Sequence, residues 1–426
     1  MPEDRFLPPS LAAEARRVAW TIVNRLDDDD AVHQAVRRTA NVAGVAPDWW
    51  GGAKLYGGNA GHALMLRYAS RVARTSADRW RDRSRDILLR AISSTSERPP
   101  AHGGLGEGTA GLALVLDEFA ADQPGYLRVR RQADRGLLQQ VARASRGGSA
   151  VDPAAYDVVT GSAGILGYLA SATTLDVDAR VTAAGLIDGL VRLYGSPPGP
   201  PLKTTETCPD RAVDLGLAHG LAGHLAALSL AWNAGLRRPG QRAAIRSLAS
   251  YLRDVAEEDA WGRIWPRRTP IDDSLPDQLP HKPMTWCYGA PGICSALLDA
   301  ARALDDPDLT AAAVMSFESA LRRALHGDGE PRTVCLCHGW SGLLTICHKF
   351  AEHGGSQNAR AALTPLTERV LSHCSDDQAL IVRTVHVPGT YVDSPSLLDG
   401  AAGVPLALWS VSTSVPPRWR RALLIG

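Results

Sequence analysis

The chain has 426 residues, of which 45% are hydrophobic and 21% charged, and its 46 basic and 45 acidic side chains give a formal net charge of +1. This balance is typical of a globular protein with enough apolar material for a sizeable core. It excludes the strongly basic class of protein that neutralises a phosphate backbone, so nucleic acid is not an expected partner.

The chain begins with MPEDRFLPPS, which lacks the charged and then apolar regions of a signal peptide. No run of about 18 apolar residues follows, so no membrane-spanning helix is expected. Seven cysteines, an odd number spread unevenly, do not predict a disulfide framework. These features predict a cytoplasmic protein in which clustered cysteines act as metal ligands or reactive thiols.

The first 45 or so residues, which include LAAEARRVAWTIVNRL, predict two helices. After them a short pattern, G-x-x-G followed by an apolar run, recurs at intervals of about 50–70 residues. The seven copies occupy residues 57–66, 107–116, 160–169, 219–228, 288–297, 338–347 and 399–408. A repeat of this period indicates a supersecondary unit that cannot bury its apolar face alone.

Each copy continues into Leu/Ala-rich sequence and then into a charged amphipathic stretch such as SADRWRDRSRDILLRAI. This content predicts a helical hairpin, with the apolar helix inside and the charged helix outside. The expected fold is all-α, an α/α toroid of seven inner and seven outer helices in a single domain over residues 1–426. The glycines would permit close backbone approach at the inner helix starts. Helix N-termini gathered at one end of the ring would place the site there.

Two connections depart from the repeat. Residues 257–285 are rich in Pro and Asp, and residues 376–396 contain a β-branched stretch that predicts a small hairpin or an extended lid. Both precede a glycine motif, so both could flank the cavity mouth. The alternative is that they are solvated connections with no function.

Two motif copies carry side chains that bind zinc. Cys287 and Cys337 occupy the same slot, two residues before the first glycine of adjacent repeats, and His338 follows Cys337. Equivalent slots of neighbouring hairpins should lie side by side, so the two thiolates and the imidazole would converge. Three protein ligands leave the fourth tetrahedral position open, which is typical of catalytic zinc.

A second thiol competes for this role. Cys335 lies two residues before Cys337, and alternate residues of an extended segment share a face. We prefer Cys337 as the ligand because its slot matches that of Cys287. The other cysteines and two histidines are interpreted as core or non-functional residues, namely Cys208, Cys294, Cys347, Cys374, His348 and His353.

Two further motif copies carry acid–base side chains. His219 precedes Gly220 in the fourth copy, in the slot that Tyr288 and His338 fill in theirs, and Asp157 comes shortly before the third copy. A histidine near a metal with a carboxylate to orient it predicts a general acid/base pair. Taken singly, His219 is also typical of a core or capping histidine and Asp157 of a helix cap.

The segments WCYGAPG, CHGWSG, AHGLAG and YDVVTGSAG, in a sevenfold glycine repeat, resemble the lanthionine synthetase C-like family. This family comprises the lanthipeptide cyclases and their glutathione-binding relatives. The resemblance runs from about residue 50 to the C-terminus. It implies that zinc is bound by the two cysteines and the histidine identified above, and that Asp157, His219 and Tyr288 are active-site residues.

The resemblance also implies a reaction and departs from the family in two places. A zinc-bound cysteine thiolate of a dehydrated precursor peptide, with leader and core, would add to dehydroalanine or dehydrobutyrine, with His219 as the leading proton donor. A dehydratase and a transporter of the same pathway are further possible partners. The alternatives are a protein that adds or binds glutathione or another small thiol, and a non-catalytic zinc-containing peptide-binding toroid. The family's arginine before the WCYG element is replaced by Pro283, with Lys282 beside it, and the family's small insertion domain has no obvious counterpart.

Overall fold

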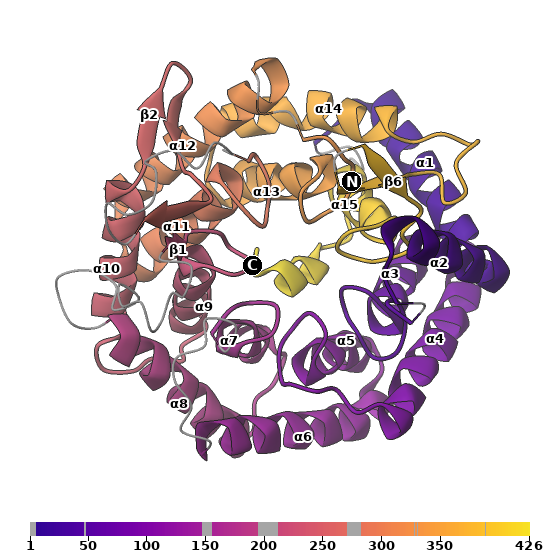
Figure 1. Ribbon diagram of the computed structural model, residues 1–426, viewed down its shortest axis with the longest axis horizontal. Helices are drawn as coiled ribbons and strands as arrows, with labels where there is room; N and C mark the ends of the chain where they lie inside the picture. The colour runs from indigo at the N-terminus through magenta and orange to yellow at the C-terminus, as the bar shows by residue number, and fades with distance from the viewer. Residues whose placement is uncertain are drawn as a thin grey trace. The chain divides into compact units, whose positions relative to one another are not determined.

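The computed structural model describes residues 6–46, 48–146, 156–194, 212–270, 283–327, 329, 331–387 and 389–426. The chain divides into two compact units. The first unit comprises Met1–Pro100 and Glu330–Trp419, and the second comprises Ala101–Gly329 and Arg420–Gly426. Helices dominate both units, and the described strands are short (Figure 1). The predicted all-α class is therefore confirmed, whereas the single domain over residues 1–426 stays a prediction.

The first unit begins with the two predicted N-terminal helices. Its elements are α1 (Pro9–Asp27), α2 (Asp29–Ala43), α3 (Asn59–Val72), α4 (Ala77–Glu97), α13 (Trp340–His353), α14 (Gln357–Ser372), β5 (Thr384–Val387), β6 (Thr390–Val392) and α15 (Gly403–Ser412). Strands β5 and β6 pair antiparallel, so the hairpin expected within residues 376–396 is present. Helices α3 and α13 pack against α4 and α14 respectively, while α15 contacts α1, α3 and α13.

The second unit repeats the same hairpin arrangement. Its elements are α5 (Thr109–Asp122), η1 (Pro124–Tyr126), α6 (Leu127–Arg146), α7 (Ser162–Ser171), α8 (Val177–Tyr194), β1 (Ala212–Asp214), α9 (Leu221–Asn233), α10 (Gln241–Asp254), β2 (Glu257–Asp259), β3 (Gly262–Ile264), β4 (Arg268–Pro270), α11 (Ala290–Leu304) and α12 (Pro307–His326). A last turn, η4 (Arg418–Leu423), crosses the boundary between the units in sequence. Helix α9 packs between α7 and α11. Strand β1 pairs antiparallel with β4, and β2 pairs with β3.

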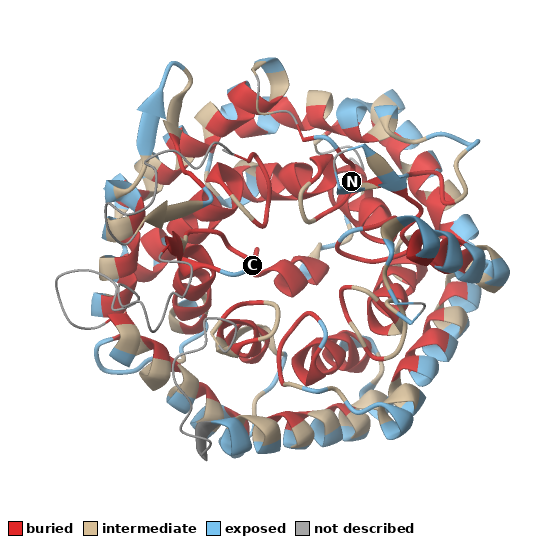
Figure 2. Cartoon of the chain, viewed as in Figure 1, coloured by how far each residue is buried: buried red, intermediate tan, exposed pale blue. Residues whose placement is uncertain are grey.

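Within each unit the helices that follow a glycine motif are buried, and the helices between them present a polar face to solvent (Figure 2). Helix α5, whose sequence is TAGLALVLDEFAAD, is buried from Thr109 to Ala120. Helix α4, rich in Arg and Asp, buries only one face, on which Trp80, Ile87 and Leu88 lie. The predicted difference between inner and outer helices is confirmed in both units, since burial follows the apolar and amphipathic patterns.

The second glycine of the motif allows a close backbone contact. A Cβ atom there would lie only 1.9–2.3 Å from the carbonyl oxygen of the residue six positions earlier, in the loop that precedes the helix. This holds for Gly61, Gly164, Gly223, Gly292, Gly342 and Gly403. Real Cβ atoms essentially never approach so closely, so each helix can lie against its own preceding loop only without a side chain at this position.

The first glycine starts the helix in six of the motifs. It is the residue before α3, α5, α7, α9, α11 and α13, in extended backbone except at Gly289. Gly289 has a φ of +87°, which favours glycine. The seventh motif differs, because α15 begins only at its second glycine, Gly403. No helix in the described ranges is long and apolar enough to cross a membrane.

Candidate active site

A buried carboxylate and a histidine form a pair in the second unit. Asp157 Oδ2 lies 2.7 Å from His219 Nδ1. The other oxygen, Oδ1, accepts the backbone N–H groups of Thr160 and Gly161 at 2.6 and 2.9 Å, just before α7. Asp157 therefore accepts backbone N–H groups at the start of a helix, as its sequence context allowed. It also holds the imidazole of His219. The predicted partnership of these two residues is present in the structure.

The pair favours the charged imidazolium. The hydrogen bond to Asp157 raises the pKa of His219, and the charges of Asp157, Asp214 and Cys287 act in the same direction, while burial opposes them. Nearly half of the His219 side-chain surface stays exposed, at 46%, whereas the Asp157 side chain is 4% exposed. A protonated, accessible imidazolium held by a buried carboxylate can donate a proton to a bound molecule.

Tyr288 lies beside this pair. Its ring centroid is 6.4 Å from that of His219. Burial raises the pKa of Tyr288 to about 12, so the phenol is protonated at neutral pH. The ring also lies against backbone, because a Cβ at Gly216 would come within 2.5 Å of Tyr288 Cδ1. The three predicted acid–base residues thus belong to one cluster.

Two residues of this cluster were not predicted. Asp214, the last residue of β1, accepts the backbone N–H of Gly216 at 2.8 Å, and its burial raises its pKa. Arg267 donates from Nη2 to the Tyr288 hydroxyl at 3.0 Å. Asp214 precedes the fourth motif much as Asp157 precedes the third, which is the only sequence signal that points to it. Nothing in the local sequence around Arg267 points to the cluster.

Backbone hydrogen bonds fix Cys287 next to the loop that carries His219. The carbonyl oxygen of Cys287 accepts the N–H groups of Leu217 and Ala218 at 2.9 and 3.3 Å. Cys287 Sγ lies 3.5 Å from the hydroxyl of Thr285. The loops that precede α9 and α11 are therefore neighbours, as expected for equivalent positions in adjacent repeats.

The other predicted ligands lie in the first unit. Cys337 and His338 are both half-buried, and His338 Nδ1 is 3.7 Å from Asp399 Oδ1. The N–H groups of Leu336 and Cys337 donate to Leu398 O, so the loops before α13 and α15 are tied in the same way. Cys335, the competing thiol, is fully buried.

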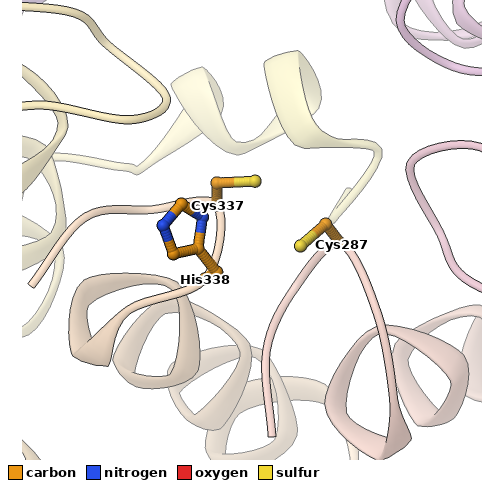
Figure 3. A group of neighbouring side chains, drawn as sticks. All are labelled: Cys287, Cys337 and His338. Atoms are coloured by element: carbon orange, nitrogen blue, oxygen red, sulfur yellow. The ribbon is translucent and has the colours of Figure 1, made fainter. Parts of the chain in front are cut away.

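Two groups of side chains could hold a metal ion among the residues that the structure describes. One is the predicted set, Cys287, Cys337 and His338, whose ligand atoms all lie within 4.8 Å of one another (Figure 3). The other combines His338 with Cys335 and Asp399 at the same limit. Two sulfurs and an imidazole are ligands that zinc prefers, and oxygen-seeking ions such as magnesium and calcium do not. The chemistry of the first group therefore fits zinc.

The remaining cysteines have surroundings unlike these. Cys294 and Cys347 are fully buried within α11 and α13, and burial raises the pKa of both thiols. Burial also raises the pKa of Cys374 to about 12. Thiols with such raised pKa values are poor nucleophiles at neutral pH. Cys208 and Lys282 lie outside the described residues.

The model of the lanthionine synthetase C-like protein family matches residues 50–424. The chain belongs to this family. The match confirms the resemblance found in the glycine motifs and in the cysteine–histidine segments.

Individual relatives agree with this assignment. The chain is 25% identical over 342 residues to the nisin biosynthesis protein NisC of Lactococcus lactis subsp. lactis, an alignment that covers 76% of this chain and 77% of that protein. Among solved structures it resembles nisin cyclase, with a TM-score of 0.75 and 23% identity over 92% of this chain and 96% of the other. This likeness shows a shared fold, and it confirms the predicted α/α toroid.

Proposed function

We propose that the protein is a zinc-dependent lanthipeptide cyclase. It closes lanthionine and methyllanthionine rings by adding cysteine thiols of a dehydrated peptide to dehydroalanine or dehydrobutyrine residues of the same peptide. The observation that carries this proposal is the Asp157–His219 pair, in which the carboxylate raises the pKa of His219 and so favours the proton-donating imidazolium. His219 lies on a loop tied by backbone hydrogen bonds to Cys287, which belongs to a zinc-type donor set. Membership of the family and the name of the relative nisin cyclase support the same reading.

The predicted ligands would be Cys287, Cys337 and His338, which leave one tetrahedral position for a substrate atom. Zinc bound there would lower the pKa of a coordinated peptide thiol from its usual value of about 8.5, so that the thiolate is present at neutral pH.

The residues of the second unit supply the proton. As the thiolate sulfur bonds to the β-carbon, the electrons of the C=C double bond move toward the adjacent carbonyl and give an enolate. The His219 imidazolium then donates its proton to the α-carbon, while Asp157 keeps the ring oriented through the 2.7 Å contact to Nδ1. The proton lost by the thiol returns to the imidazole, directly or through water, so no atom is gained or lost.

The substrate of this proposal is a dehydrated precursor peptide with leader and core. A dehydratase would have to supply it, because only dehydration of Ser or Thr makes the acceptor double bond. A transporter of the same pathway would receive the product. The proposed location is the cytoplasm.

The proposal is tested by loss of peptide thiols without change of mass. Dehydrated peptides of varied sequence are incubated with zinc-loaded protein, denatured, alkylated and weighed by mass spectrometry. Ring closure is an isomerisation, so cyclised cysteines resist alkylation while the mass of the peptide stays the same. Zinc-free protein is the reference, because such additions also occur without a catalyst.

Three other outcomes would contradict the proposal. Equal rates of thiol loss with zinc-loaded and zinc-free protein across the panel would exclude catalysis. A mass increase in the presence of glutathione would indicate addition of a small thiol instead. Tight binding of peptides whose thiols remain open to alkylation would indicate a non-catalytic peptide-binding protein.

A further inference from the structure

Arg267 is held in place by the backbone of the segment that leads into the His219 loop. Its carbonyl oxygen accepts the N–H of Leu215 at 3.1 Å. The next residue, Arg268, begins β4 and is paired with Asp214 of β1. The backbone position of Arg267 is therefore set by the β1–β4 ladder, from which its exposed side chain extends.

The Arg267 side chain contacts Tyr288 in two ways. Its Nη2 donates to the phenolic oxygen at 3.0 Å, and its guanidinium carbon lies 4.1 Å from the centroid of the ring. The backbone of Gly216 also lies against the ring, since a Cβ there would be 2.5 Å from Cδ1. A hydrogen bond, a cation–π contact and a backbone contact together fix both the plane of the phenol and its oxygen.

The direction of the hydrogen bond determines what Tyr288 can do. A guanidinium has only donors, so the phenolic oxygen is the acceptor and its own hydrogen points elsewhere. Within the described ranges no side chain or backbone group accepts that hydrogen. The donor capacity of Tyr288 is thus free for a bound molecule, in a ring that neighbours His219.

We propose that Arg267 is a positioning residue, which occupies the oxygen lone pair of Tyr288 and so directs the phenolic hydrogen toward the carbonyl oxygen of the dehydrated residue. This inference rests on the proposed function. In it, Tyr288 donates a hydrogen bond to the oxygen on which negative charge develops when sulfur attacks, while His219 protonates the α-carbon. Donors aimed at developing charge lower a barrier more than they strengthen ground-state binding, so the effect belongs in kcat.

A double-mutant cycle tests this role. Arg267→Met should lower kcat for ring closure about tenfold, which corresponds to about 1.4 kcal/mol, and change KM less than about twofold. Because Arg267 acts through the phenol, Arg267→Met should cost nothing further in a Tyr288→Phe background. Arg253→Met, which removes an exposed arginine at the end of α10, is the matched control and should leave both constants unchanged.

Two results of the cycle would overturn the proposal. One is additive losses in the double variant. The other is a salt-dependent rise in KM in Arg267→Met that is absent from Arg267→Lys. That result would make Arg267 an independent charge for binding peptide. A lysine keeps the charge but cannot reproduce the planar contact, so we expect it to restore kcat only in part.

A measurement without substrate separates this proposal from the proposed function. With 13Cζ-labelled tyrosine, the resonance of Tyr288 is assigned by its loss in Tyr288→Phe. It should shift in Arg267→Met and not in Arg253→Met. An unchanged resonance in Arg267→Met would overturn the placement of Tyr288 by Arg267. Failure of the wild-type chain to form rings would overturn the proposed function instead, while the resonance would still decide the contact.

Discussion

At Asp157 the two carboxylate oxygens have separate partners. One accepts backbone N–H groups before α7, and the other faces His219. The first role belongs to the fold and the second to the proposed chemistry. Replacement by asparagine keeps an oxygen that can accept the backbone N–H groups, so it removes mainly the charge that faces the imidazole.

Asp157→Asn should therefore change the pH dependence of ring closure. The wild-type pKa of His219 is raised, first by the hydrogen bond to Asp157, so the imidazolium persists to higher pH. Without that carboxylate the donor is lost at lower pH, and the alkaline limb of the rate profile should move to lower pH. The contribution of the pair to stability is complete below the unfolded pKa of histidine and is lost as pH rises through the folded pKa. The variant should accordingly lose more stability in acid than in alkaline buffer.

The control for this experiment is Asp188→Asn, which removes a half-exposed surface carboxylate paired with Arg238. It should leave the pH profile unchanged. Rate profiles of wild type and Asp157→Asn with the same alkaline limb would show that Asp157 does not set the protonation of His219.

The metal ligands give a second prediction at the residue scale. One zinc ion per chain is expected, and Cys287→Ala or Cys337→Ala should lose both the ion and ring closure, because a three-ligand site loses a thiolate. Cys335→Ala should keep both, since Cys335 belongs only to the alternative group with His338 and Asp399. Elemental analysis of the purified variants decides between the two groups. Zinc lost from Cys335→Ala but kept by Cys337→Ala would show that our ligand assignment is wrong.

At the scale of elements, the glycine motif works through steric contact. The second glycine lies where the helix meets the carbonyl oxygen of its own preceding loop, and this contact recurs through the repeat. The recurrence explains why one local pattern could predict so many helix starts. It also predicts that glycines elsewhere in the same hairpins behave differently.

Gly164→Ala and Gly185→Ala should change stability in opposite directions. A Cβ at Gly164 in α7 would lie 1.9 Å from Val158 O, so the helix or the loop must move, at a cost of about 1–3 kcal/mol. Gly185 lies inside α8, and no atom lies within 4 Å of the position that an added methyl group would take, so alanine there should stabilise by about 0.5–1 kcal/mol. Urea denaturation of both variants measures the difference. Equal effects would show that the close contact does not constrain the motif.

Local pattern also explains which parts of the site were predictable. Cys287, Cys337 and His219 stand at fixed positions in the repeat, and β5 and β6 follow from β-branched residues around a turn. Strands β1 and β4 were not predicted, since each has three residues and their pairing joins segments far apart in sequence. Asp214 and Arg267 depend on that ladder for their positions. They were missed because no local periodicity encodes a non-local pairing.

At the scale of the whole molecule, the last residues of the chain belong to a different unit from the segment that precedes them. Residues Arg420–Gly426 belong to the second unit, although Glu330–Trp419 before them belong to the first. Trp286 donates from its indole nitrogen to Leu423 O at 2.9 Å, just before Cys287. The last residues of the chain thus complete the packing around a loop that carries a proposed ligand.

The last residues of the chain also take part in a buried group of charges. Arg421 lies 2.6 Å from Asp117 Oδ2 and 2.7 Å from Glu118 Oε1, and all three side chains are buried. Arg421 also donates to the carbonyl oxygens of Ser171 and Leu114, so it joins α5 to the end of α7. Removal of one partner from such a group is strongly destabilising, because it leaves buried charge uncompensated.

Arg421→Met should therefore destabilise the second unit by about 3–5 kcal/mol, because Asp117 and Glu118 would stay buried with one cation fewer. Hydrogen exchange in α5 and α7 should accelerate more than in α3 and α4 of the first unit, since the lost contacts all lie in the second. Arg238→Met removes an exposed arginine from a surface pair with Asp188 and should change exchange little. If Arg421→Met instead accelerated exchange equally in all four helices, the end of the chain would stabilise the molecule as one cooperative body, and the buried charges would not act on the second unit alone.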